Sequence, residues 1–142
     1  MHIKFSPEAA QIMDMRFGCD NLIALATVDE SGTPWVRNVN AYYENGSFYV
    51  ITNLLSNKMQ HIKANPVVAI SGDWFTAHGR GENLGYILKA QNLDLIDKLR
   101  TVFGEWYDNG HINEAEINTV ILRIRLTNGV LFNNGTRYDL EF

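Results

Sequence analysis

A succession of strand-length segments separated by turn sequences is the feature that most restricts how this chain can fold. The small and apolar run 22–28 predicts a buried strand, which ends at the turn-forming residues 29–34. Residues 35–43 then alternate with a period of two between a mostly apolar face and a face that is polar at its centre. Asn45-Gly46 is a tight-turn pair, after which Phe48 to Thr52 returns as a strand. The sequence therefore predicts a meander of three antiparallel strands.

Three helices are expected around this meander. Ser6-Pro7 is a good helix start, and apolar residues at helical spacing follow as far as Gly18, which is placed to end the helix. Ser56 is predicted to cap a second helix that runs to Asn65, with Met59 and Ile62 facing inward. The third helix is expected to have about four turns, with one apolar face. That face comprises Leu93, Leu95, Ile96, Leu99, Val102, Phe103 and Trp106.

The remaining segments add strands. Residues 67–72 and 120–126 have strand patterns, and Asn128-Gly129 predicts a hairpin turn before a return strand over 130–132 and a last extended piece from Gly135. The Gly-rich segment 73–88 fits no period and is expected as a strand, a loop or both. The pattern predicts one domain over 1–142, of α+β class but mainly β, with five to seven antiparallel strands in a barrel or sheet and flanking helices.

Composition excludes several classes of function. The formal net charge is -4 and the cations are scattered singly, so nucleic acid is not an expected partner. No apolar stretch is long enough for a signal peptide or a membrane span, which makes the cytoplasm the expected compartment. The lone Cys19 forms no internal disulfide and is expected as a small buried residue. The histidines lack the spacing of a metal site.

The segment in which a strand ends and a helix begins, residues 52–58, is the best candidate for chemistry. Helix N-termini present unpaired N–H groups and partial positive charge, so they favour a bound phosphate. Ser56 adds a hydroxyl and Lys58 a cation in the first turn. Taken alone, however, these residues favour a capped helix that carries a solvated lysine over a phosphate site.

Residues 51–70, together with the strand 34–40, resemble the pyridoxamine 5'-phosphate oxidase family of FMN-binding split β-barrels. The resemblance rests on an Arg-x-Val strand (37–39), a Thr-Asn strand end (52–53) and a Ser-x-Lys helix start (56–58), in that order within about residues 20–74. It implies a Greek-key split barrel that binds FMN.

The resemblance also implies which residues hold the cofactor. In the family, the Arg-x-Val strand lies along the flavin, and the strand end and helix start hold the phosphate. The FMN-binding residues implied are Arg37, Asn38, Val39, Asn40, Ile51, Thr52, Asn53, Ser56, Asn57 and Lys58. Because Asn38 and Asn40 face away from Arg37 and Val39, the strand must also contact the flavin through its backbone.

The chain departs from the true oxidases in three places. Asn57 stands where they carry an Arg, Tyr42 stands where they carry a Lys that serves the substrate, and their Arg-containing final segment is absent from GTRYDLEF. Oxidation of vitamin B6 is therefore not expected. The general stress and nitroimidazole-resistance branches of the family fit better.

An FMN-dependent oxidoreductase of unknown small-molecule substrate is the expected function, with a nicotinamide as one possible electron donor and no catalytic acid or base assigned. The alternatives are a flavin-binding or flavin-sensing protein without turnover, and a barrel that binds haem or a deazaflavin. The resemblance implies a homodimer with each flavin at the subunit interface. Trp106 and Tyr107 are expected to pack at a helix end or to reach a partner's flavin. Residues 73–74 and 78–81 either approach the ring or form an ordinary loop.

Overall fold

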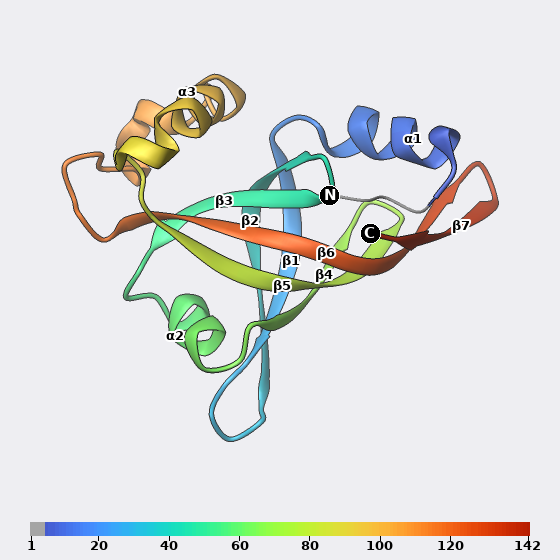
Figure 1. Cartoon of the computed structure of the whole chain (residues 1–142), viewed down its shortest axis with the longest axis horizontal. Coiled ribbons are helices and arrows are strands. Elements are labelled where there is room, and N and C mark those ends of the chain that lie inside the picture. The colour runs from blue at the N-terminus through green and yellow to red at the C-terminus, as the bar shows by residue number, and fades with distance from the viewer. Residues whose placement is uncertain (1–4) are drawn as a thin grey trace.

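The computed structural model describes residues 5–142, in which antiparallel strands form a closed barrel (Figure 1). The order β3-β2-β1-β4-β5-β6 is closed by pairing of β3 with β6, while β7 extends the sheet beyond β6. Because β4 returns to lie beside β1 after the β1-β2-β3 meander, the connection is a Greek key. The predicted fold class is confirmed. The strands are β1 (Asn21–Val28), β2 (Pro34–Glu44), β3 (Ser47–Asn53), β4 (Val67–Gly72), β5 (Phe75–Tyr86), β6 (Thr119–Asn133) and β7 (Thr136–Glu141).

The main core fills the barrel with every second strand residue. In β2 and β3 these include Val39, Ala41, Phe48 and Val50, all buried. The prediction of a strand over residues 22–28 is confirmed, but it is buried only at alternate residues. One face of β1 points into the barrel, and Leu22 on the other face is 62% exposed, as is common in antiparallel sheets.

Helix α1 (Pro7–Phe17) covers one end of this core. The Ser6 hydroxyl accepts the Ala9 N–H at 3.1 Å, as expected of its cap, and the inward face buries Met13 and Phe17. Cys19, predicted to be buried, is exposed. It lies in the short connection to β1, and such connections run over the surface.

A second cluster of buried side chains lies outside the barrel, where α3 (Leu93–Val102) packs. Ile96, Leu99 and Phe103 are buried there, as predicted, but Leu93 is 47% exposed. The helix is shorter than expected and follows a 3-10 turn, η1 (Ala90–Asn92). After α3 the chain turns and forms a π-helical turn, η2 (Tyr107–His111). No helix in the described residues is long and apolar enough to cross a membrane.

The hairpin predicted at Asn128-Gly129 is wrong. Strand β6 runs straight through this pair, and the turn occurs at Asn134-Gly135, where both residues have positive φ (51° and 79°). A Cβ on Gly129 would lie 2.9 Å from the Thr76 carbonyl oxygen. Gly129 therefore allows β5 to approach closely, rather than the chain to turn.

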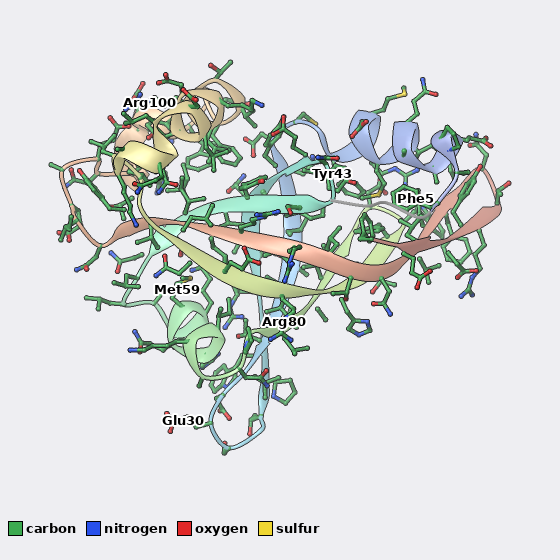
Figure 2. The ribbon with its side chains drawn as sticks, in the orientation of Figure 1. Phe5, Glu30, Tyr43, Met59, Arg80 and Arg100 are labelled. Carbon is green, nitrogen blue, oxygen red and sulfur yellow. The ribbon has the colours of Figure 1, made fainter. Side chains whose placement is uncertain are left out.

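The unassigned segment 73–88 is mostly strand β5, which follows a turn at Asp73-Trp74. Its glycines permit close packing: a Cβ on Gly81 would lie 2.8 Å from the Ile62 side chain of α2 (Asn57–Ala64). Figure 2 shows Met59 on the barrel side of α2 and Glu30 at the tip of the long β1–β2 hairpin. Helix α2 is thus fixed beside the β1–β2 hairpin, close to the end of β3.

Candidate cofactor site at the split of the barrel

The barrel is split between β2 and β3. Strand β2 pairs with β1 from Pro34 to Ala41, and β3 pairs with β6 along its whole length. The two strands pair with each other only beside their hairpin, as far as Tyr42 and Tyr49. Beyond that point one edge of β2 has no partner strand in the described chain. Its backbone N–H and C=O groups must bond to water or to a ligand.

A cavity of about 420 Å³ lies in this split, a size common for small-molecule sites. Both divergent strands, the first turn of α2 and the segment after α3 contribute to its wall. The lining residues are Val39, Asn40, Val50, Ile51, Thr52, Lys58, Trp106, His111 and Ile112. The structure thus brings together the predicted residues Val39, Asn40, Ile51, Thr52 and Lys58.

Lys58 is half-buried at the edge of this cavity. Burial lowers the pKa of its ammonium group, and the positive charge of Arg37 lowers it further. No acidic residue in the described chain offsets these two effects. Two neighbouring cations that are withdrawn from water and unpaired form a favourable place for an anion.

Arg37 is held in one orientation by its Nη1 atom. This nitrogen donates to the Thr27 hydroxyl at 2.6 Å, to the Leu25 carbonyl at 3.2 Å and to the Trp35 carbonyl at 3.4 Å. Burial lowers the pKa of the guanidinium. The Nε and Nη2 donors have no partner among the described residues, so they remain available to a ligand.

The start of α2 differs from the prediction in one respect. The Ser56 hydroxyl does not cap the helix but donates to the Asn53 carbonyl at 2.7 Å, while the Asn53 side chain accepts the Leu55 N–H at 2.8 Å. These bonds shape the turn that joins β3 to α2. No side chain of the described residues accepts a hydrogen bond from the N–H groups of the first helical turn. These N–H groups are therefore available to a bound anion.

Several predicted residues lie outside the cavity wall. Asn38 is exposed on the outer face of β2, and Asn53, Ser56 and Asn57 lie in or beside the turn before α2. The glycine-containing segment 78–81 belongs to β5, where it pairs with β4 and β6 away from the lining.

Asp20 is a residue that sequence reasoning missed. Its carboxylate accepts the Trp106 Nε1–H at 2.7 Å and the Asn40 amide at 3.1 Å, so it ties two cavity-lining side chains together. The Trp106 ring also packs against Phe103, with the ring centroids 5.0 Å apart and the planes tilted by 34°. An aspartate at a helix-to-strand connection has no pattern that would have indicated this role.

Hydrogen bonds to Glu114 hold the segment that carries Trp106 and His111. Glu114 accepts hydrogen bonds from Tyr107 at 2.6 Å and from Arg100 at 2.8 Å. Burial raises the pKa of Tyr107 and the bond to Glu114 raises it further, whereas the bond from Arg100 lowers the pKa of Glu114. At neutral pH the Tyr107 phenol therefore stays protonated and the Glu114 carboxylate stays ionised. The hydrogen bond between them holds the η2 turn in place.

A family model for pyridoxamine 5'-phosphate oxidase matches residues 13–130, which include both divergent strands and α2. The chain belongs to the pyridoxamine 5'-phosphate oxidase family. The pyridoxine/pyridoxamine 5'-phosphate oxidase of Photobacterium profundum is 28% identical over 61% of this chain and 41% of its own length. That of Rippkaea orientalis is 40% identical over 38% of this chain and 26% of its own. The chain thus spans less than half the length of the curated relatives it matches.

Solved structures place this family member among small split barrels. General stress protein 26 from Bacillus anthracis superposes with a TM-score of 0.67 at 17% identity, over 86% of this chain and 92% of that protein. A putative 5-nitroimidazole antibiotic resistance protein from Bacteroides thetaiotaomicron superposes with a TM-score of 0.62 at 12% identity, over 98% and 87%. These similarities establish the shared fold.

Other proteins with this fold are named for different ligands. They include a FAD-binding protein from Mesorhizobium loti (TM-score 0.67, 16% identity), an F420 reductase (0.60, 23%) and the haem storage protein HutZ from Vibrio cholerae (0.65, 18%). They cover 100%, 82% and 86% of this chain, and 100%, 94% and 89% of their own. Proteins that share this fold are thus named for more than one ligand, and the fold alone does not identify the ligand of this chain.

The lining of the cavity in this family member combines two kinds of chemistry. Lys58 contributes a cation, with Arg37 nearby. Trp106 and Ile112 contribute aromatic and aliphatic surface. Such a site suits a ligand with a planar apolar body and an anionic tail.

Proposed function

We propose that this family member binds FMN in the split cavity, with the phosphate at Lys58 and Arg37 and the flavin ring toward Trp106. The observation that carries the proposal is that partly buried Lys58 lines the same cavity as Trp106 and lies beside a second partly buried cation, Arg37, while neither has an acidic partner in the described chain. A phosphate monoester carries about -1.5 to -2 charge at neutral pH, which matches two cations.

The chain's own residues bind and orient the cofactor. The open edge of β2 offers backbone donors and acceptors along residues 38–40, and Asn40 and Thr52 add side-chain donors at the cavity wall. The phosphate charge is held by Lys58 and Arg37, while Val39, Ile51 and Trp106 limit the access of water. When bound, FMN supplies hydride or electron transfer.

We propose that the protein uses this flavin as an oxidoreductase acting on a small molecule, with a nicotinamide as a candidate donor. His111 is exposed at the cavity wall and is the titratable group best placed to meet a second substrate. A flavin-binding protein without turnover is the competing function. Bleaching of the bound flavin by NADH or NADPH, followed by reoxidation with an added acceptor, supports the enzyme; a flavin that no donor reduces supports the binder.

A homodimer is part of this proposal, because exposed apolar side chains of β1 and β2 lie next to the cavity. Directly paired strand residues lie on the same face, so Val36, Ala26 and Ala69 share the outer face of β2, β1 and β4. Val36 is 70% exposed, and Leu22 on the same face is paired with the cavity residue Asn40. A second copy seated on this surface would cover it and complete the site. Light scattering of native protein and of Val36→Asp should give a dimer and a monomer; a native monomer at micromolar concentration contradicts the dimer.

The decisive experiment is to identify and titrate the cofactor. Purified protein is expected to show a flavin spectrum, and mass spectrometry of the released ligand should give FMN. Protein stripped of ligand should bind FMN more tightly than riboflavin, because only FMN carries the phosphate. A haem or deazaflavin spectrum with no FMN binding would replace the proposal by the corresponding alternative, since structural neighbours are named for these ligands.

A further inference from the structure

We propose that Thr27 and His61 form a relay that positions Arg37 for the phosphate. The relay links three elements, from His61 on α2 through Thr27 on β1 to Arg37 on β2. This inference rests on the proposed function, because it assigns residues that act on the phosphate through Arg37. Neither Thr27 nor His61 lines the cavity.

Hydrogen-bond donors and acceptors fix the direction of the relay. Thr27 is 0% exposed, and its hydroxyl lies 2.6 Å from Arg37 Nη1 and 2.8 Å from His61 Nδ1. Arginine only donates, so the Thr27 oxygen accepts from Arg37. No other described residue accepts the Thr27 proton, and a buried donor needs a partner. The Thr27 hydroxyl therefore donates to His61 Nδ1, which leaves the His61 ring proton on Nε2.

His61 is itself held in place. It lies near the end of α2, three residues after Lys58, and its ring centroid is 6.3 Å from that of Trp35 on β2. The helix that carries one cation of the anion site thus also carries the acceptor that orients the other. The relay fixes the position of Arg37 relative to Lys58.

Loss of the Thr27 hydroxyl would loosen Arg37. Its Nη1 atom would keep only the two longer bonds, at 3.2 Å to Leu25 and 3.4 Å to Trp35. A guanidinium that is free to rotate must be ordered when the phosphate binds, and ordering one such side chain is expected to weaken binding roughly 2- to 13-fold. The isoalloxazine ring does not depend on this order, so riboflavin affinity should not change.

Flavin titrations of the apoprotein test the relay. Dissociation constants for FMN and for riboflavin are measured by quenching of flavin fluorescence in native protein, Thr27→Val and Thr27→Ser. Thr27→Val is expected to weaken FMN binding by roughly 2- to 13-fold without affecting riboflavin binding, and Thr27→Ser should keep native FMN affinity because it keeps the hydroxyl. Ser47→Ala is the matched control. The buried Ser47 hydroxyl accepts a hydrogen bond from Arg123 Nε at 3.1 Å, and Ser47 does not line the cavity.

The outcomes separate the relay from the proposed function. Equal FMN affinity of native protein and Thr27→Val, or equal losses for FMN and riboflavin, overturns the relay while FMN binding stands. Failure of native protein to bind FMN overturns both. If Thr27→Val does not fold, His61→Leu replaces it, because His61 is only partly buried. Its FMN affinity must fall relative to riboflavin affinity for the relay to hold.

Discussion

Replacing Lys58 by Met should separate two effects of a cation in this cavity, its effect on the stability of the apoprotein and its effect on FMN affinity. Methionine keeps much of the side-chain length and apolar contact but removes the charge. In the unliganded protein, Lys58 is half-buried beside Arg37 and has no acidic partner in the described chain. Removing it relieves both desolvation and repulsion, so the apoprotein should be at least as stable as native protein.

FMN affinity should change in the opposite direction. A hydrogen bond to a charged group contributes about 1.5–3 kcal/mol, and each 1.4 kcal/mol corresponds to a factor of ten, so the dissociation constant should rise roughly 10- to 150-fold. Because Lys58 is only half-buried, solvent screening places the expected change toward the lower end of this range.

Two measurements on the same samples test this reasoning. Isothermal titration gives the dissociation constant for FMN, and urea unfolding of the apoprotein gives its free energy of unfolding. Lys63→Met is the matched control, since Lys63 is an exposed lysine of the same helix outside the split cavity. It should change neither quantity by more than about 0.5 kcal/mol.

The assignment of Lys58 to the phosphate would be refuted by a Lys58→Met protein that binds FMN as tightly as the Lys63→Met control. A lower free energy of unfolding of the Lys58→Met apoprotein would also contradict the reasoning, because it would show that the lysine stabilises the fold. A gain in stability together with a loss in affinity is typical of a residue retained for function.

Three further outcomes are expected. A bound anion favours the charged form of Lys58, so the pKa of Lys58 should be higher in the FMN complex than in the free protein, where it is lowered. FMN affinity should therefore fall as the pH rises between these two pKa values, and the affinity of Lys58→Met should not change over that range. Asp20→Ala removes the acceptor of Trp106 and Asn40, so riboflavin and FMN should both bind roughly tenfold more weakly; unchanged riboflavin affinity contradicts a ring beside Trp106. Gly129→Ala should lower the free energy of unfolding by about 1–3 kcal/mol in denaturant, because its Cβ would meet the Thr76 carbonyl at 2.9 Å; an unchanged value excludes close packing there.

The parts of the fold that depend on local pattern could be predicted from the sequence. The first three strands follow from the apolar run 22–28, from the alternation over 35–43 and from the turns at 29–34 and Asn45-Gly46, and the structure confirms each of them. The Ser6-Pro7 helix start is confirmed for the same reason, since a cap acts within one turn. The opening of α2 was located correctly, although the Ser56 hydroxyl bonds to Asn53 instead of the helix.

The parts that depend on distant neighbours could not be predicted. Asn128-Gly129 has the composition of a turn, but β5 pairs with it and holds it extended. Asp20 and Trp106 are 86 residues apart, and no local pattern connects them. The same holds for Thr27 and His61, whose contact exists only because α2 packs on β1. Side chains of the candidate site that meet across the fold need the tertiary structure to be identified.

The charge of the anion site is where this chain departs from the oxidases it resembles. Asn57, at the position where the resemblance implies an arginine, is exposed and neutral at the helix start. Lys58 and Arg37 remain, and their two charges suffice for one phosphate monoester. A site with two cations gains less from phosphate than one with three, so a larger share of the binding free energy must come from the ring. The hydrogen bond from Trp106 to Asp20 and the bond that holds the η2 turn fix the aromatic surface that the ring would contact. If the proposed site holds, selectivity between flavin, deazaflavin and haem should therefore depend more on the cavity wall after α3 than on the turn between β3 and α2.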